Sequence, residues 1–279
     1  MEQLCVPRNG PMNVVVFFSG GASSLKAMLA DENHGKLYRV SGAYTDKADA
    51  KGRQLCRENG IPELFIDRAE FYSGRGLHSR DWNSREMFYE MLASEIARFS
   101  PDVICLSGYM HIVADPLLAE YENRILNVHP ADLTILTGPT ASRLDASQLH
   151  TAEVENLRTT NELVRKFKGE NAVADAIVAR ERSTRSTIHV ARREFDEGPI
   201  VVQSKPFFVD SGIYSPISHG LTSVLDEYAS SLQEGMKLEG DGPAYLKALE
   251  FISSGRIAVN SDSVFLDGKR LPYCGFRLG

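Results

Sequence analysis

The stretch Ile125-Leu126-Asn127-Val128-His129-Pro130 has the pattern of a short buried strand that ends in two polar residues and a proline. Side chains alternate along a strand, so the amide of Asn127 and the imidazole of His129 point to the same side. Because proline cannot extend a central strand, the pair lies at the strand's carboxyl end. Ligands bind at that end in open α/β sheets. The stretch therefore predicts a ligand site, if the rest of the chain builds such a sheet.

Strand and helix patterns alternate along the chain with short connections, which predicts the α/β class with a doubly wound, mostly parallel sheet. We expect strands over residues 13–18, 38–44, 63–66, 103–106, 125–128, 186–190 and 200–209. We expect helices over residues 25–29, 50–59, 88–99, 115–121, 148–167, 172–182, 217–235 and 243–253, and a surface loop over residues 67–84. The chain ends in a predicted hairpin over residues 257–271, where Asp267-Gly268 favours a primed turn.

The composition is that of a globular protein rather than a nucleic-acid or membrane protein. Of the 279 residues, 43% are hydrophobic and 24% are charged, and the net charge of -6 gives no reason to expect general nucleic-acid affinity. No apolar run is long enough to span a bilayer. The four cysteines argue against a zinc knot or a disulfide framework because they are widely separated: Cys5, Cys56, Cys105 and Cys274. We therefore expect a soluble cytoplasmic protein without a bound metal.

A turn of small residues, Ser19-Gly20-Gly21-Ala22-Ser23-Ser24, follows the first predicted strand. The turn leads into a predicted helix with serine at its N-cap. Free N–H groups and the positive end of the helix dipole favour a phosphate or carboxylate at such a position. The turn alone is a weak signal, because it lacks both a full Gly-x-Gly-x-x-Gly and a P-loop lysine.

Several motifs occur in a definite order along the chain. They are SGGASSL at residues 19–25, LSGYMHIV at 106–113, NVHP at 127–130, STIHV at 186–190 with FDEGPI at 195–200, and a tail with GRI at 255–257 and LDGKRLP at 266–272. In this order they resemble the folate-dependent formyltransferase family, and within it the branch of phosphoribosylglycinamide formyltransferases. The resemblance covers nearly the whole chain. It implies a Rossmann-like formyltransferase fold with a C-terminal helix and hairpin extension.

The resemblance implies a role for each motif, with 10-formyltetrahydrofolate as co-substrate, a phosphorylated small-molecule amine as acceptor, and no metal. It assigns catalysis to Asn127, His129 and Asp196, substrate and phosphate binding to Gly21, Ala22, Ser23, Ser24 and Asp241, folate binding to Met110, His111, Ile112 and Val113, and an orienting role to His189. Of these, His111 departs from the purine branch, where arginine is usual.

The implied reaction explains why these residue types are needed. A primary amine attacks the formyl carbon on N10 of the folate and creates a tetrahedral oxyanion. The imidazolium of His129 and the amide of Asn127 would donate hydrogen bonds to this oxyanion, and losing one such donor typically costs about 10²–10³ in rate. Asp196 would hold His129 charged and help to move protons, because pairing with a carboxylate raises the pKa of a histidine.

The resemblance also implies a single formyltransferase domain over residues 1–279. A phosphate and substrate half would span about residues 13–130. An insertion of roughly thirty residues would follow over about residues 135–165, as a lid or a reshaped acceptor pocket. The remainder of the catalytic domain and the C-terminal hairpin would span residues 166–279.

Other departures from the family concern the side of the site that would hold the amine. Ala22 stands where glycine is usual, Ser24 where asparagine is usual, and Asp241 where a glutamate is usual. We expect the methyl group of Ala22 to press on a bound phosphate or to force a different φ on the turn. The catalytic motifs are kept, whereas the acceptor side is altered.

The acceptor expected first is glycinamide ribonucleotide, in purine biosynthesis, and three alternatives stay open. The chain could formylate another amine, such as an amino sugar nucleotide. It could hydrolyse 10-formyltetrahydrofolate, although such hydrolases usually carry an N-terminal regulatory domain, for which the residues before Asn13 are too few. It could bind a nucleotide or folate without catalysis. The methionyl-tRNA branch is disfavoured because this acidic chain lacks a basic C-terminal extension, and a homodimer stays open.

Overall fold

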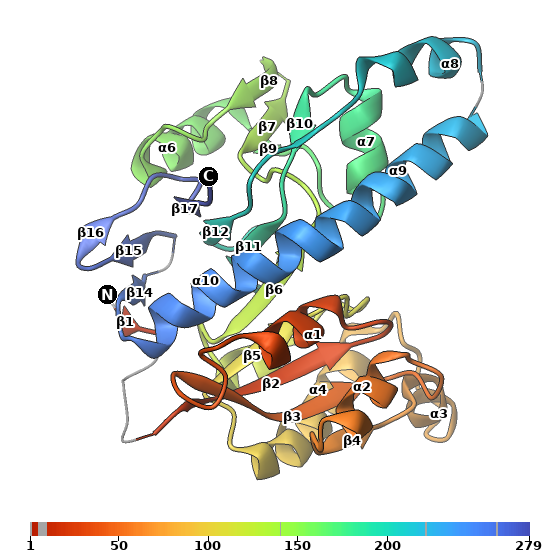
Figure 1. Ribbon diagram of the computed structural model, residues 1–279, viewed down its shortest axis with the longest axis vertical. Coiled ribbons are helices and arrows are strands. Elements are labelled where there is room, and N and C mark those ends of the chain that lie inside the picture. The colour runs from red at the N-terminus through yellow and green to blue at the C-terminus, as the bar shows by residue number, and fades with distance from the viewer. Residues whose placement is uncertain (1, 5–9, 140, 221, 261) are drawn as a thin grey trace.

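An eight-stranded, mostly parallel sheet lies at the centre of the fold, with helices on both faces (Figure 1). Its strands are β2 (Met12–Phe18), β3 (Tyr38–Thr45), β4 (Glu63–Phe65), β5 (Val103–Leu106), β6 (Ile125–His129), β11 (Thr187–Val190), β12 (Ile200–Gln203) and β17 (Phe276–Arg277). They are arranged in the order β17-β12-β11-β6-β5-β2-β3-β4. Neighbours are parallel except at β11, which is antiparallel to both β6 and β12.

This computed structural model describes residues 2–4, 10–139, 141–220, 222–260 and 262–279. The helices are α1 (Ser23–Ala30), α2 (Gly52–Glu58), α3 (Arg68–Ser73), α4 (Trp82–Ile96), η1 (Ala97–Phe99), α5 (Asp115–Glu120), α6 (Thr151–Asn161), α7 (Ala172–Val178), η2 (Ser211–Ile213), α8 (Tyr214–Ser218), α9 (Thr222–Met236), the π-helix η3 (Lys237–Asp241) and α10 (Gly242–Ser253). Within the described ranges, no helix is both long and apolar enough to cross a membrane. Cys56, Cys105 and Cys274 are buried free thiols, and Cys5 lies outside the described residues.

Strand β2 is buried on both faces, which is why its sequence is a continuous apolar run. Val14, Val16 and Phe18 belong to one core that also holds buried residues of α1 and α10. Val15 and Phe17 belong to a second core with buried residues of α4 and α5. The alternation of side chains along the strand thus supplies both cores from one segment.

The chain leaves the sheet centre in both directions from β2, because β2 pairs with β3 on one side and with β5 on the other. Such a reversal of strand order opens a crevice at the carboxyl ends of the strands. The segments after β2, β5 and β6 meet at this edge, and they carry the small-residue turn, the 106–113 motif and the Asn127–His129 pair.

Helices α9, η3 and α10 form one long rod that crosses the molecule between its red-to-orange part and its green part (Figure 1). Tyr245 of α10 is fully buried against the sheet. Its hydroxyl lies 2.7 Å from the carbonyl oxygen of Leu106 and 3.1 Å from that of Leu126. The rod is thereby joined to β5 and β6 near the ends that carry the candidate site.

Residues 135–165 form a compact unit outside the central sheet. Strands β7 (Ile135–Gly138), β8 (Ala141–Asp145) and β9 (Val164–Arg165) make a three-stranded sheet in the order β8-β7-β9, and α6 lies between β8 and β9 in the chain. Two further sheets lie outside the central one. One has four strands, β1 (Glu2–Gln3), β14 (Ile257–Val259), β15 (Val264–Leu266) and β16 (Lys269–Arg270), and the other pairs β10 (Ser183–Thr184) with β13 (Phe207–Phe208).

The structure corrects three of the predicted elements. Residues 67–84 are not only a loop, because Asp67 caps helix α3 by accepting hydrogen bonds from the N–H groups of Ala69 and Glu70. The predicted helix over residues 148–167 is limited to α6 and ends where Glu162 takes a left-handed φ of 53°. The predicted strand over residues 200–209 breaks into β12 and β13, separated by Ser204-Lys205-Pro206.

The predicted C-terminal hairpin turns at Asp267-Gly268, as expected. Strands β15 and β16 pair on either side of this turn. Both turn residues have positive φ, 52° and 77°, which a primed turn requires.

Candidate active site

Strand β6 presents Asn127 and His129 at its carboxyl end. Strand β11 pairs antiparallel to it, with His189 directly opposite Asn127. The side-chain nitrogen Nδ2 of Asn127 lies 3.2 Å from Nε2 of His189. Nδ1 of His189 lies 3.0 Å from the carbonyl oxygen of Val190, so it carries the proton and Nε2 accepts from the amide. The two side chains are therefore in contact across the β6–β11 pair.

Asp196 reaches the same place from the loop between β11 and β12. Its Oδ2 lies 3.3 Å from Nδ1 of His129, and its Oδ1 lies 3.4 Å from both Nδ2 of Asn127 and Nε2 of His189. The backbone N–H of Gly169 donates to Oδ2 at 3.1 Å. Asp196 itself has a φ of 58°, a left-handed conformation that non-glycine residues rarely adopt. The structure thus brings together four residues that lie up to 69 positions apart in the chain.

His129 is almost completely buried, and both of its ring nitrogens face acceptors. Nε2 lies 2.7 Å from the carbonyl oxygen of Phe167, and Nδ1 faces Asp196. Burial lowers the pKa of His129 below its ordinary value, and the charge of Asp196 and the Phe167 carbonyl only partly oppose this. Pairing with Asp196 raises the pKa of His129, as expected, but desolvation of the buried ring is the larger effect and keeps this pKa below its ordinary value.

Asp196 is ionised in this site. Burial raises the pKa of its carboxyl group, but the adjacent imidazoles of His189 and His129 outweigh burial and hold the pKa well below its usual range. The N–H of Gly169 acts in the same direction. A carboxylate in this position stabilises a positive charge that forms on the adjacent imidazole.

A cavity of about 1120 Å³ opens above these residues. Its lining includes Ser19, Gly20, Gly21, Ala22 and Ser23 after β2, Leu106 to Val113 after β5, Asn127 to Pro130 after β6, and Gly169, His189, Asp196 and Asp241. Every residue predicted for the site therefore borders this cavity except Ser24, which is fully buried beneath the turn.

The small-residue turn takes a left-handed conformation at Ala22, whose φ is 53°. Its methyl group is 3% exposed and belongs to the core beneath the turn. Close packing there explains the nearby glycine, since a Cβ on Gly52 would lie 2.9 Å from that of Ala22. The methyl group therefore packs in the core beneath the turn, although Ala22 also borders the cavity.

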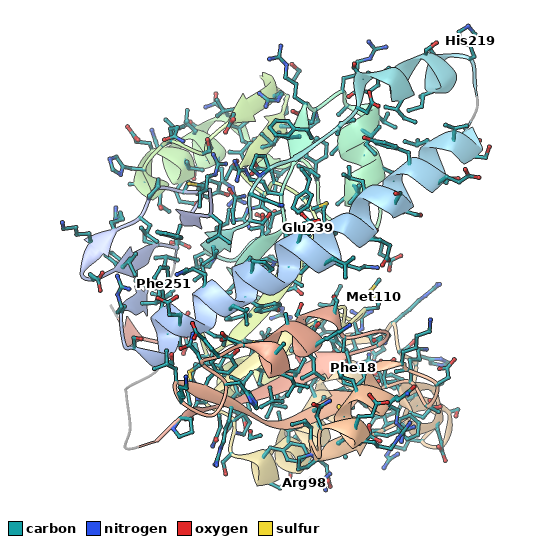
Figure 2. The ribbon with its side chains drawn as sticks, in the orientation of Figure 1. Phe18, Arg98, Met110, His219, Glu239 and Phe251 are labelled. Carbon is teal, nitrogen blue, oxygen red and sulfur yellow. The ribbon has the colours of Figure 1, made fainter. Side chains whose placement is uncertain are left out.

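The 106–113 segment is tied to the small-residue turn by a polar chain. The hydroxyl of Ser19 donates to Oδ1 of Asp46 at 2.6 Å, and Nε2 of His111 lies 2.8 Å from the other oxygen of Asp46. The N–H of Met110 in turn donates to the Ser19 hydroxyl at 3.3 Å. Met110 is 57% exposed and lies on the side of the red-to-orange part that faces the helical rod (Figure 2).

Asp241 lies at the end of η3 and borders the cavity from the opposite side. It is 7% exposed, and its Oδ1 has no hydrogen-bond partner among the described residues. Burial raises the pKa of this carboxyl group to about 6. A buried carboxyl oxygen without a partner is costly, and it suits a site that receives donors from a ligand.

Three further groups of the site were not predicted from the sequence. Asp46 follows β3 directly, so an acidic residue at a strand's carboxyl end was a usable signal. The Phe167 carbonyl had no signal, because every residue carries one. Arg165, whose Nη1 donates to the carbonyl oxygen of Asp196 at 2.5 Å, could be placed only by the tertiary fold. Across the described residues, no group of three or more His, Cys, Asp or Glu is arranged to hold a metal ion.

Comparison with known proteins agrees with the fold and the motifs. Residues 12–144 match the model of the formyl transferase family. Phosphoribosylglycinamide formyltransferase of Escherichia coli (strain K12) is 24% identical over 266 residues, which are 95% of this chain and 98% of that protein. The structure of phosphoribosylglycinamide formyltransferase from Coxiella burnetii is similar with a TM-score of 0.69 at 21% identity, covering 96% of this chain and 100% of that one.

A formyltetrahydrofolate deformylase from Pseudomonas syringae pv. tomato shares the fold more distantly. Its TM-score is 0.61 at 16% identity, and the match covers 92% of this chain and 66% of that one. The predicted doubly wound, Rossmann-like fold of the formyltransferases is confirmed.

Proposed function

We propose that this chain, whose residues 12–144 match the model of the formyl transferase family, transfers the formyl group of 10-formyltetrahydrofolate to the primary amine of glycinamide ribonucleotide. The observation that carries the proposal is the meeting of Asn127, His129 and Asp196 within hydrogen-bonding distance at one wall of a large cavity. The small-residue turn and the 106–113 segment border the same cavity, so it has room and groups for both an acceptor and a folate.

The reaction needs hydrogen-bond donors beside the oxyanion and a group near the amine that relays its proton. The attacking nitrogen forms a bond to the formyl carbon, and the bond from that carbon to N10 breaks. The amide of Asn127 and the N–H of His129 stabilise the oxygen that becomes negative. Asp196 is ionised and contacts both side chains, so it stabilises the imidazolium and relays the proton that passes from the amine to N10.

This mechanism requires His129 to change partners. Its Nε2–H donates to the Phe167 carbonyl. The formyl oxygen must take the place of that carbonyl, and the negative charge that develops there raises the pKa of His129 during the reaction. Water is excluded from the buried ring, which strengthens the interaction when it forms.

Purified protein given 10-formyltetrahydrofolate and glycinamide ribonucleotide tests the proposal. We expect tetrahydrofolate and formylated product to form in equal amounts. Turnover with a different amine, such as an amino sugar nucleotide, and none with this acceptor would replace the acceptor and keep the reaction. Ligand binding without turnover across a panel of amines would favour a non-catalytic binding protein.

The hydrolase is the alternative that one observation favours, namely the shared fold with a formyltetrahydrofolate deformylase. It is distinguished by release of formate and tetrahydrofolate in the absence of any amine. The transferase predicts that tetrahydrofolate formation depends on the acceptor. Four expectations stay predictions: a cytoplasmic location, a homodimer, an inserted segment at residues 135–165, and the absence of a nucleic-acid partner.

A further inference from the structure

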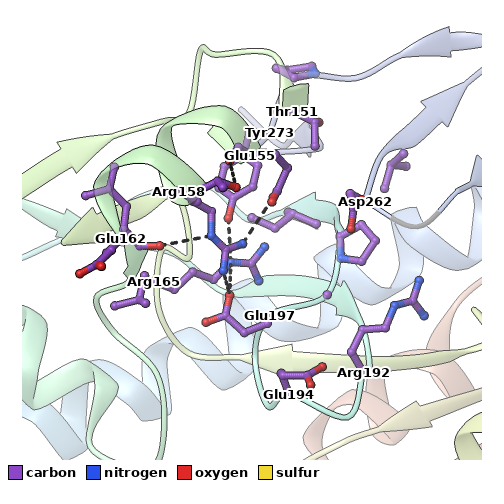
Figure 3. Close-up of a pocket in the computed structure, with 18 residues that line it drawn as sticks. Thr151, Glu155, Arg158, Glu162, Arg165, Arg192, Glu194, Glu197, Asp262 and Tyr273 are labelled. Atoms are coloured by element: carbon purple, nitrogen blue, oxygen red, sulfur yellow. Dashed lines mark hydrogen bonds and ion pairs between the residues drawn. The ribbon is translucent and has the colours of Figure 1, made fainter. Parts of the chain in front are cut away.

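A second cavity, of about 570 Å³, lies beside the candidate active site (Figure 3). Helix α6, the loop after Asp196 and the C-terminal segment near Tyr273 border it. Its walls carry many charged side chains. Ion pairs and hydrogen bonds between some of these side chains join the three segments. The cavity therefore marks a junction between separate parts of the chain.

Glu197 is the centre of this junction. Its side chain is 14% exposed and receives Nη2 of Arg158 at 2.7 Å and Nζ of Lys168 at 2.6 Å. Arg158 belongs to α6, whereas Lys168 follows Phe167, whose carbonyl contacts His129. Glu197 is the chain neighbour of Asp196, so its ion pairs restrain the loop that carries the carboxylate.

Arg165 restrains the same loop through its backbone. Its side chain is 1% exposed, and its Nη1 donates to the backbone carbonyl of Asp196 at 2.5 Å. Its Nε donates to the hydroxyl of Tyr273 at 2.9 Å. The carbonyl of Asp196 and the side chain of Glu197 are thus each held by an arginine from the 151–165 region.

We propose that Arg158 and Glu197 are positioning residues, which hold Asp196 in its left-handed conformation and its carboxylate against His129. This inference rests on the proposed function, because it takes the role of Asp196 from there. A left-handed aspartate relaxes to another φ unless its surroundings hold it. The carboxylate is only 3.3 Å from Nδ1 of His129, so a small rotation of the loop would break the contact.

Activity assays on single and double variants test the inference. We expect Arg158→Ala and Glu197→Gln each to lower kcat about 10- to 100-fold, because a displacement of about 1 Å at a reaction centre can cost that much. The KM for both substrates should stay within threefold. The double variant should be no worse than the poorer single variant, since both remove one contact. Arg158→Lys should recover part of kcat.

The matched control is Arg256→Ala. This arginine pairs with Asp267 at 2.6 Å on the exposed C-terminal hairpin, away from Asp196. Its removal should leave kcat within twofold. Loss of kcat in this control as large as in Arg158→Ala would assign the effect to general destabilisation and overturn the inference.

Titration of His129 by NMR, without any substrate, provides a readout independent of turnover. Its signal is identified by its absence in His129→Asn. If Arg158 and Glu197 position Asp196, both variants lower the pKa of His129, because the carboxylate that raises it moves away. If they act only by charge at a distance, Arg158→Ala raises this pKa and Glu197→Gln lowers it.

Shifts of opposite sign, or no shift in either variant, overturn the positioning role. If the pKa of His129 falls in both variants but the wild-type protein transfers no formyl group, the proposed function is refuted and the positioning contact still stands. Arg158→Lys serves the titration as well if Arg158→Ala does not fold.

Discussion

Nε2 of His129 lies 2.7 Å from the carbonyl oxygen of Phe167, so the nitrogen that would face an oxyanion already has a partner. This contact satisfies a buried imidazole that would otherwise lose a hydrogen bond. The same N–H group therefore serves stability through Phe167, and the proposed reaction requires it to serve the oxyanion. Variants at His129 and its neighbours should separate these two demands.

Replacing His129 by asparagine should lower kcat by about 10²–10³ or more, because the reaction loses an oxyanion donor and a proton carrier. Binding of a folate analogue, measured by calorimetry, should stay within threefold of wild type. The control is His219→Asn, which replaces an exposed histidine in the loop after α8 and should leave kcat unchanged. Equal kcat in wild type and His129→Asn would remove this histidine from the mechanism.

Asp196 should make the protein sensitive to acid. Its pKa is lowered on folding, so it contributes stability above its unfolded pKa of about 3.9, and this contribution is lost as the pH falls through the folded pKa. At pH 7 the wild type should exceed Asp196→Asn by about 1–3 kcal/mol in free energy of unfolding. Denaturant titrations at pH 7 and pH 3 check whether the gap narrows in acid. A gap that widens toward pH 3 would contradict the assignment.

Asp241 should act in the opposite direction. Burial raises its pKa to about 6, so its contribution is fully present below the unfolded pKa and is lost as the pH rises through the folded value. Asp241→Asn does not ionise and should be more stable than wild type at pH 8 by about 1–3 kcal/mol, with little difference at pH 4.

The same Asp241→Asn variant should bind the acceptor less well, with a raised KM for glycinamide ribonucleotide. Asp226→Asn, at an exposed position of α9, is its control and should keep the wild-type pH profile. If Asp241→Asn is destabilised at pH 8, the carboxylate has a partner that stabilises its charged form.

Ala22→Gly tests whether the methyl group affects the ligand. Glycine relieves the strain at φ 53° but loses a buried methyl group, so the free energy of unfolding should change by less than about 1 kcal/mol. The acceptor KM should stay within threefold, since the methyl group packs in the core. A KM reduced tenfold or more would show that the methyl group presses on the ligand.

The central fold could be predicted from the sequence because its signals are local. The apolar run of β2 and the short polar end of β6 each identify a strand without reference to the rest of the chain. The Asp267-Gly268 turn is equally local. The region of residues 135–165 was harder, since a small sheet of short strands with mixed burial has no strong periodicity.

The candidate site was predictable only in part. Asn127 and His129 share a strand, so their common direction follows from alternation, and Asp196 was reached through the family motif. The pKa of His129 could not be predicted, because it depends on how completely the surrounding segments cover the ring. In the sequence, Arg165 and Glu197 cannot be told from other charged residues, and only the fold shows that they meet beside Asp196.

Tyr245 gives the reaction centre one wall that cannot move independently. Its buried hydroxyl bonds to the carbonyl oxygens of Leu106, the last residue of β5, and Leu126, which precedes Asn127 in β6, so Asn127 and the start of the 106–113 segment are anchored to the same helix. The facing groups, Asp196 and the Phe167 carbonyl, come from connecting segments instead. Substitutions in the connecting segments can therefore displace Asp196 or the Phe167 carbonyl while the backbone of β6 stays in place.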